Sequence, residues 1–357
     1  MRRTVVASLV AVPETSGSAL YGMVDVLSAV GSLWGELMRR PAAEAGTRLD
    51  IRIVAPTPEP FLCGNGIPVA PYMAVDACPA TDIVILPELW IGPDEPMRGR
   101  HPSVMDWIRR MYARGAALYS ACSGSVMLAE TGLVDHCQVT SHWAYRELFQ
   151  AHYPAVRFLP EPTLTCADPA GRIVTAGGTT SWHDLAIHII ARHAGAAEAV
   201  RIAKIYLLKL HPEGQRPWSP LVRDVPHGDG AVRRCQVWLA DHFLDDDALA
   251  GAVRHSGLPQ RTLKRRFKAA TGSPLIQYIQ NLRIEHAREL LETTRDPVDD
   301  IAHAAGYEDA SFFRLLFRRM TGLSPAQYRR MFQAAALQGV ERRGTVGIKE
   351  LGVSSRP

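Results

Sequence analysis

Four basic side chains in the C-terminal third of the chain could bind a polyanion. Arg261, Lys264, Arg265 and Lys268 recur at helical spacing, directly after Gln260. On a helix these positions share one face, because residues three and four apart are neighbours on its surface. Arg and Lys donate hydrogen bonds to phosphate oxygens and to the acceptor edge of guanine. The pattern therefore indicates a helix that contacts DNA, although a basic stripe on an isolated helix is more often a solvated face.

The sequence around this stripe repeats. The phrase FKAATG over 267–272 recurs as FRRMTG over 317–322, fifty residues later. Each copy follows a short helical run, a turn that contains Gly257 or Gly306, and a second helix. Two helices joined by a three- or four-residue turn form a helix-turn-helix unit, whose second helix can enter a major groove. The repeat therefore predicts two such units and favours the DNA-binding interpretation of the stripe.

The apolar residues of both second helices predict which side chains stay outside. Leu263 and Phe267 are four residues apart and can pack inward. In the second unit the inward positions are Phe313, Leu316, Phe317 and Met320. The side chains predicted to contact DNA are Gln260, Arg261, Lys264, Arg265, Lys268, Ser311, Phe312, Arg314 and Arg318.

One cysteine could act as a nucleophile or line a pocket. Cys122 stands between a strand pattern over 116–120 and a helix pattern over 125–131, with Gly124 beside it. This order is typical of a nucleophile elbow, which exposes the side chain at the carboxyl end of a sheet. A nearby helix N-terminus would lower the thiol pKa. His142 could approach Cys122, and Asp25 is a further candidate for the pocket, although a surface position suits it equally well.

The elements that must position these residues fall into two groups. Short apolar strand patterns cover residues 4–12, 51–55, 82–86, 116–120 and 172–176. Helix patterns lie between them at 19–33, 103–113, 125–131, 143–151 and 182–194. Apolar strands alternating with helices predict a flavodoxin-like, doubly wound α/β domain with a parallel sheet. Beyond it, seven helical runs broken by Gly or Pro predict an all-α domain: 231–243, 247–254, 259–270, 275–293, 298–304, 310–320 and 325–335.

Composition places the boundaries between these parts. Residues 211–230 contain four prolines and three glycines, which predicts a linker between a domain at 1–210 and a domain at 231–335. Residues 336–357 are expected to form a flexible tail. The net charge of +4 is concentrated late in the chain, since residues 231–335 hold 16 Lys and Arg against 12 Asp and Glu. A polyanion partner is therefore sought there.

Other classes of protein are disfavoured by the same sequence. The longest apolar runs have the length of a strand, and no convincing signal peptide precedes Pro13, so we expect a cytoplasmic protein with no membrane contact. The six cysteines form no CxxC pair and have no ligand-like spacing to His. Neither a metal site nor a disulfide framework is expected, and no cofactor is predicted.

The helical part resembles the DNA-binding domain of AraC/XylS-type regulators. The resemblance covers about 100 residues, and its phrases are LKRRF (263–267), LRIEHARELL (282–291), PVDDIA (297–302), GYEDASF (306–312) and GLSPAQY (322–328). It implies two helix-turn-helix units joined by the long helix at 275–293 and set into successive major grooves. Leu315 stands where relatives often carry Arg, which concerns how specifically the second unit reads bases.

The first part resembles the PfpI/ThiJ class I glutamine amidotransferase-like domain, in the form fused to AraC-type regulators (GlxA-like regulators). Its phrases are SACSG (120–124), LAETGLVD (128–135), TSHW (140–143), VTAGG (174–178) and DLAIH (184–188). Proteolytic members have His directly after the Cys, whereas this chain has Ser123. The position of a Glu in enzyme relatives falls on Ala19. The resemblance therefore favours a ligand pocket at Cys122 and His142 over a working catalytic site, and a purely structural Cys122 remains a further alternative.

Together these features predict a sequence-specific DNA-binding transcription regulator that responds to a small metabolite near Cys122. The expected partners are double-stranded promoter DNA, a small-molecule effector, a second copy of the chain on two half-sites, and RNA polymerase if the protein is an activator. Two alternatives remain. One is a PfpI-like hydrolase or amidotransferase-type enzyme with a DNA-binding tail, and the other is an architectural DNA binder without a ligand.

Overall fold

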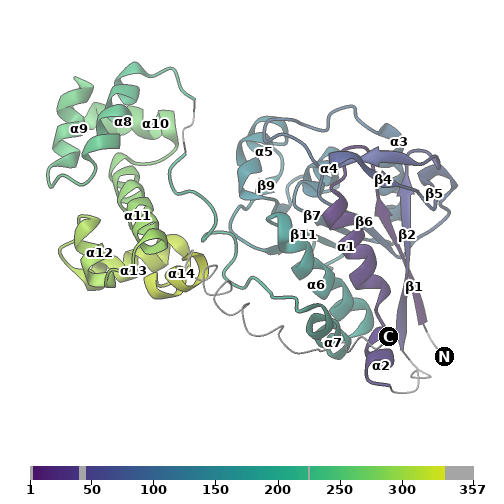
Figure 1. The fold of residues 1–357 in the computed structure, drawn as a ribbon. Coiled ribbons are helices and arrows are strands. Elements are labelled where there is room, and N and C mark those ends of the chain that lie inside the picture. The colour runs from purple at the N-terminus through teal and green to yellow at the C-terminus, as the bar shows by residue number, and fades with distance from the viewer. Residues whose placement is uncertain (1–2, 40–45, 224–225, 334–357) are drawn as a thin grey trace, which may run out of the picture. The chain divides into compact units, whose positions relative to one another are not determined.

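Two units make up the chain, and the structure is a computed structural model that describes residues 3–39, 46–223 and 226–333. The first unit runs from Met1 to Gln215 and the second begins at Arg216. Figure 1 shows a layered α/β arrangement in the first unit and helices alone in the second. The tail predicted at 336–357 lies outside the described residues.

A seven-stranded sheet forms the centre of the first unit. Its strand order is β10-β11-β7-β6-β1-β2-β5, and every neighbouring pair is parallel except β10 with β11. The five predicted strands are all present, and the central order is that of a flavodoxin-like sheet. The sheet strands are β1 (Arg3–Val10), β2 (Thr47–Ala55), β5 (Met73–Ala74), β6 (Ile83–Leu86), β7 (Ala117–Ala121), β10 (Leu164–Cys166) and β11 (Ile173–Ala176).

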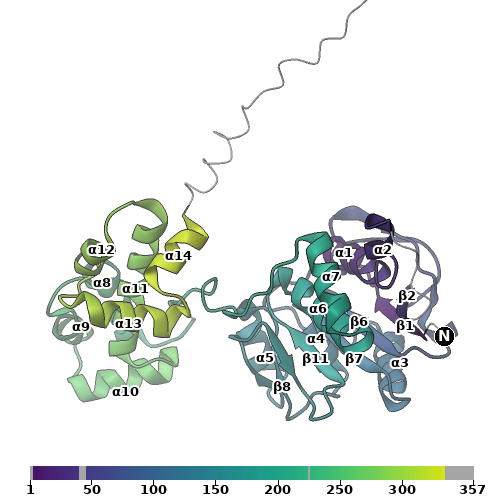
Figure 2. The ribbon, with the colours of Figure 1, turned by 90° about the horizontal axis from the view of Figure 1, so that it is seen from below.

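Helices cover both faces of the sheet, as the predicted doubly wound fold requires (Figures 1 and 2). On one face α1 (Gly17–Ser28), α6 (Trp182–Ala194) and α7 (Ala196–Tyr206) close a core that contains the buried Tyr119. On the other face α3 (Pro102–Ala113), α4 (Gly124–Glu130) and α5 (Arg146–His152) close a core around Trp107.

The prediction of one helix over 19–33 is wrong in its second part. Helix α1 ends at Ser28, and a separate helix, α2 (Leu33–Leu37), follows. Gly31 lies between them with φ 78°, and a Cβ there would lie 2.6 Å from the carbonyl oxygen of Thr47. The chain turns where only glycine fits this close approach. Short elements that the sequence did not predict are β3 (Phe61–Cys63), β4 (Ile67–Val69), β8 (Gln138–Val139), β9 (Arg157–Phe158) and single turns at Gly64–Gly66, Val75–Ala77 and Thr179–Ser181.

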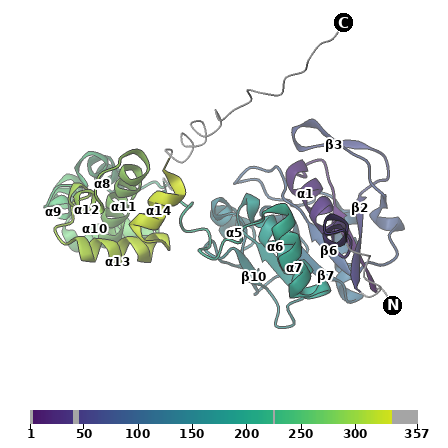
Figure 3. The same cartoon turned by 60° about the horizontal axis from the view of Figure 1, so that its bottom comes forward.

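The second unit contains the seven predicted helices. Figure 1 shows the long α11 between one group formed by α8, α9 and α10 and another formed by α12, α13 and α14, and Figure 3 shows the same helices from another side. Two separate apolar clusters form, one around Leu263 and Phe267 and the other around Phe313 and Phe317. The helices are α8 (Gly230–His242), α9 (Ala248–Ser256), α10 (Gln260–Thr271), α11 (Leu275–Thr293), α12 (Val298–Ala304), α13 (Ala310–Thr321) and α14 (Pro325–Phe332).

No helix of the described part of the chain has both the length and the apolar character needed to cross a bilayer.

Candidate functional site

Helix α10 is the second helix of the first helix-turn-helix unit. It follows α9 after a turn in which Gly257 adopts φ 69° and Pro259 precedes the first helical residue. Leu263 and Phe267 are fully buried, as their spacing predicted. The five side chains predicted to contact DNA from this helix are all exposed: Gln260, Arg261, Lys264, Arg265 and Lys268.

Arg266 has a different role from its basic neighbours. Its guanidinium donates from Nε and Nη2 to the two carboxylate oxygens of Asp229, both at 2.7 Å. The same carboxylate accepts from the backbone N–H groups of Ala231 and Val232 and so caps the start of α8. Hydrogen bonding to Arg266 lowers the pKa of Asp229. This two-point pair fixes α10 against α8 and leaves the opposite face of α10 to the solvent.

Helix α13 occupies the matching place in the second helix-turn-helix unit. Asp309 caps it by accepting from the N–H groups of Ser311 (2.7 Å) and Phe312 (3.2 Å). Ser311, Phe312, Arg314 and Arg318 are exposed, and Leu315 is 70% exposed. Arg314 pairs with Asp299 on α12, so it is already engaged within the unit. The outward face of α13 is thus more apolar than that of α10.

Helix α11 joins the two helix-turn-helix units through one side chain. Arg283 donates from Nε to the carbonyl oxygen of Phe243 (2.8 Å), from Nη1 to Gly306 (2.9 Å) and from Nη2 to Asp245 (3.0 Å). Phe243 and Asp245 follow α8, on the side of the first helix-turn-helix unit, whereas Gly306 lies in the turn of the second helix-turn-helix unit. The guanidinium therefore holds the two turns against one helix.

The turn at Cys122 is formed as the sequence predicted, but the prediction that it exposes the side chain is wrong, because Cys122 is buried. Cys122 follows β7 with φ 52°, a left-handed conformation that is uncommon for a residue with a side chain. Gly124 permits the turn, because a Cβ there would lie 2.2 Å from the carbonyl oxygen of Leu86. The Cys122 carbonyl accepts from Ser141 Oγ at 2.6 Å. The turn lies at the carboxyl end of β7, the usual place for a site in such a sheet.

The thiol of Cys122 contacts a carboxyl group that the sequence did not reveal. Its Sγ donates to Glu88 Oε1 at 3.6 Å, and only 2% of the residue is exposed. Burial and then the Glu88 charge raise the pKa of Cys122, so the predicted lowering by a helix N-terminus is wrong. Burial also raises the pKa of Glu88, against hydrogen bonds from Thr179, Cys122 and Ser16. Glu88 follows β6, beside β7. A charged residue two positions after a buried strand was the available signal.

The other two residues predicted for this pocket lie differently. His142 neighbours Ser141, but its Nδ1 accepts from the N–H of Ala144 at 3.1 Å and its ring packs on Trp143. Asp25 is exposed on α1, nine residues beyond the helix start near Ser16, or about 13 Å along the helix. The structure brings the loop of His142 to the elbow and does not bring Asp25 there.

Comparisons with known proteins match both parts of the chain. The DJ-1/PfpI family matches residues 30–192, and a helix-turn-helix domain matches residues 252–331. The HTH-type transcriptional regulator CdhR of Pseudomonas aeruginosa is 28% identical over 76% of this chain and 78% of its own. The regulator GlxA of Rhizobium meliloti is 27% identical over 62% and 68%. A solved AraC family transcriptional regulator from Pseudomonas putida is 17% identical, with TM-score 0.44, over 57% of this chain and 99% of its own.

These matches agree with the architecture described above, a DJ-1/PfpI-type α/β unit followed by two helix-turn-helix units on one long helix. The relatives that match most of the chain are transcriptional regulators. The chain is therefore a DNA-binding transcription regulator of the AraC type that carries a DJ-1/PfpI-family domain at its amino end.

Proposed function

We propose that this regulator reads promoter DNA with α10 and α13 and responds to a small molecule bound at the elbow end of the sheet. One observation carries the first half of the proposal. Arg261, Lys264, Arg265 and Lys268 are exposed on one helix, and within the described ranges no carboxylate forms an ion pair with any of them. Cations without such partners are available for phosphates and base edges.

The two helices suit different kinds of contact. On α10, Arg261 and Arg265 can approach the acceptor edge of guanine, and Gln260 at the helix start suits adenine. On α13, Phe312 and Leu315 offer exposed apolar groups that can contact thymine methyls, and Arg318 can contact a phosphate. Sequence preference is therefore expected from both helices, with the charge-dependent part of the affinity coming mainly from α10.

Further partners follow from the regulator function. Two half-sites on promoter DNA suit a homodimer, and an activator would also contact RNA polymerase. The cytoplasm, where bacterial relatives meet chromosomal DNA, is the expected compartment.

The test is fluorescence anisotropy of the full-length protein on its own upstream DNA, with scrambled DNA as the comparison, at two salt concentrations. Specific binding should be on the order of a thousandfold tighter and should weaken with salt. The double variant Lys264→Ala, Arg265→Ala should remove most of the difference. Equal and weak binding to both DNAs would argue against α10 as the reading helix.

Enzymatic use of the elbow is a second candidate, favoured by the contact between the Cys122 thiol and Glu88. Three properties argue for a passive site. The thiol is buried and its pKa is raised. Its neighbour is also an acid, Glu88, whereas a reactive thiol ordinarily has a cationic neighbour. Cys122→Ala should therefore leave promoter control intact. Hydrolase activity that disappears in Cys122→Ala would support the enzyme instead.

A further inference from the structure

Gln215, the last residue of the first unit, is a polar side chain buried inside that unit. Only 4% of it is exposed, and its backbone N–H donates to the carbonyl oxygen of Glu161 at 2.7 Å. Its side chain enters between the loop that follows β8 and the end of β11. A glutamine in a linker sequence ordinarily faces water, so its burial needs a specific reason.

The surroundings of Gln215 are complementary to a primary carboxamide. Nε2 donates to the carbonyl oxygens of Ser141 (2.9 Å) and Pro162 (3.1 Å) and to Thr140 Oγ1 (3.3 Å). Oε1 accepts from the backbone N–H of Trp143 at 3.2 Å. Because backbone carbonyls only accept, the NH₂ end of the amide must face them. A carboxylate in this place would set an oxygen against two carbonyl oxygens.

A glycine leaves the space for this amide. A Cβ on Gly177 would lie 2.3 Å from Nε2 of Gln215 and 2.5 Å from its Cδ. Any other residue at position 177 would therefore fill the slot. Gly178, the next residue, would place its Cβ 3.5 Å from Oε1, in ordinary contact.

The slot shares its wall with the elbow. Ser141, whose carbonyl oxygen accepts from Gln215, donates through Oγ to the carbonyl oxygen of Cys122. Thr140 in turn donates its N–H to Thr175 Oγ1 on β11 at 2.9 Å. Ser141 is thus a shared neighbour of the slot and of the turn that holds Cys122.

Gln215 also ends the part of the linker that the first unit holds. Upstream, His211 donates its backbone N–H to Asp184 Oδ1 at 2.8 Å, and its Nδ1 lies 2.7 Å from Oδ2. The carbonyl oxygen of His211 accepts from Thr163 Oγ1 at 2.6 Å. If the Gln215 side chain leaves its slot and its backbone N–H also leaves the Glu161 carbonyl oxygen, the next anchor on this side is His211, so residues 212–215 become free chain.

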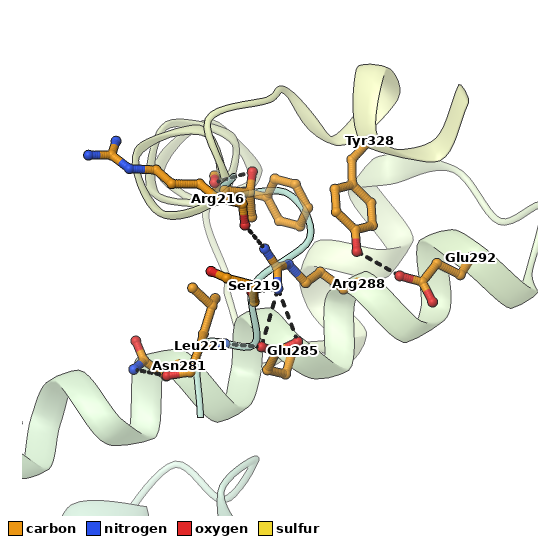
Figure 4. Close-up of polar contacts among 10 residues, drawn as sticks. Arg216, Ser219, Leu221, Asn281, Glu285, Arg288, Glu292 and Tyr328 are labelled. Carbon is orange, nitrogen blue, oxygen red and sulfur yellow. Dashed lines mark hydrogen bonds and ion pairs between the residues drawn. The ribbon is translucent and has the colours of Figure 1, made fainter. Parts of the chain in front are cut away.

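The second unit takes hold of the chain at the very next residue (Figure 4). Arg288 of α11, which is 5% exposed, donates from Nη2 to the carbonyl oxygen of Arg216 (2.8 Å) and from Nη1 to that of Ser219 (2.9 Å). Asn281 Nδ2 donates to the carbonyl oxygen of Leu221 at 2.7 Å, and Glu285 accepts its N–H. One peptide bond therefore joins Gln215, the last residue anchored in the first unit, to Arg216, the first residue anchored on α11, the helix between the two helix-turn-helix units.

We propose that this slot is a carboxamide-binding site, occupied here by Gln215 as a tethered ligand, and that small molecules with a primary carboxamide on a flexible stem compete for it. Displacement of Gln215 frees four residues of the tether, which can span up to about 14 Å. The inference deepens the proposed function by naming the effector class, and it rests on that function only for the consequence at DNA.

Chemical rescue tests the slot without DNA. Gln215→Ala removes the equivalent of acetamide, so the full-length variant should have a lower Tm than the wild type, and acetamide should raise that Tm saturably. Acetate, the matching acid, should not. The wild type, in which Gln215 itself occupies the slot, and Gln138→Ala, which removes an exposed glutamine of the same unit, should show a much smaller shift with acetamide and none with acetate. Equal effects of acetamide on all three proteins, or equal effects of acetate and acetamide on Gln215→Ala, would overturn the proposal.

A second measurement uses the wild type and does not depend on the variant folding. Propionamide at high concentration should speed amide hydrogen exchange at Gly214 and Gln215, whose N–H groups donate to the carbonyl oxygens of His211 and Glu161, and leave β11 unchanged, whereas propionate should change neither. Unchanged exchange at Gly214 and Gln215 would contradict the displacement. Rescue by acetamide with no carboxamide effect on DNA affinity would support the slot and contradict its use as the effector site, leaving the DNA-binding function of α10 as a separate result.

Discussion

Basic residues that are neighbours on α10 have different roles. Arg266 is engaged by both carboxylate oxygens of Asp229, whereas Lys264 and Arg265 point into solvent. The phrase LKRRF gives no sign of this difference, because Asp229 lies 37 residues earlier. The direction of each side chain on the helix decides whether it faces solvent or the rest of the unit. Only the packing of α8 against α10 gives Arg266 a structural role.

This sorting predicts two separable phenotypes. Lys264→Ala should weaken DNA binding and reduce the slope of log K against log salt by about 1, with unchanged Tm, because a phosphate contact is lost. Arg266→Ala should lower Tm by loosening α10 from α8, with little change in the salt slope. Anisotropy titrations at several salt concentrations and thermal melts measure both. A lowered Tm in Lys264→Ala together with an unchanged slope would contradict the assignment.

Glu88 predicts a dependence of stability on pH. Burial raises its pKa above the ordinary value of 4.5, so the folded state favours the protonated acid. A group whose folded pKa is raised contributes its full stability below the unfolded pKa and loses it as pH rises through the folded pKa. The unfolding free energy of the wild type should therefore fall as pH rises above about 4.5.

Denaturant unfolding across this pH range tests the Glu88 prediction. Glu88→Gln removes the titration and should flatten the dependence, while Glu36→Gln, at an exposed position of α2, should retain it. The same slope in all three proteins would show that the Glu88 carboxyl does not titrate differently in the folded state.

At the scale of elements, the elbow depends on a close approach between two strand ends. A Cβ on Gly124 would lie 2.2 Å from the Leu86 carbonyl oxygen and 2.6 Å from that of Pro87, and neither backbone atom can move aside cheaply. Gly124→Ala should therefore cost about 1–3 kcal/mol of unfolding free energy. Gly92→Ala is the control, because its Cβ would meet only Glu95 at 3.7 Å. Denaturant titration of both variants gives the comparison, and equal stability would mean that the turn tolerates a side chain.

Elements with their own periodicity were predictable, and elements defined by tertiary contact were not. The seven helices of the second unit and the five long strands follow from apolar spacing and from Gly and Pro signals. Strands such as β8 and β9 contain two residues, too few for any period to be visible. Helix α7 begins directly after Gly195, which reads as the end of α6 and not as a new start.

The site divides in the same way. The Cys122 turn and the exposed faces of α10 and α13 are local features, and the sequence predicted them. Glu88 and Gln215 reach their partners across 34 and at least 53 residues, so only the folded sheet brings these groups together.

At the scale of the whole molecule, if the proposed dimer binds two half-sites, we expect the tether between the two units of each protomer to limit the half-site spacing that the dimer tolerates. With Gln215 in its slot, no free chain separates the anchors at Gln215 and Arg216. An insertion of five base pairs between half-sites moves them apart by about 17 Å and turns them by about half a helical turn. We expect wild-type binding to the inserted DNA to fall strongly, because a tether held at Gln215 and Arg216 leaves no free chain between these anchors to reach the displaced half-site.

Gln215→Ala should lose less affinity on the inserted DNA than the wild type, since four freed residues per protomer add up to about 14 Å of reach. On DNA of natural spacing the variant should bind no tighter than the wild type. A longer tether lowers the effective concentration of the second protomer's DNA-binding unit at its half-site. Anisotropy on both DNAs, with half-sites located first by footprinting, measures this difference. Gln138→Ala should behave as wild type. Equal losses in Gln215→Ala and wild type would mean that the chain between the units does not limit spacing, and the limit would then lie in the dimer contact itself.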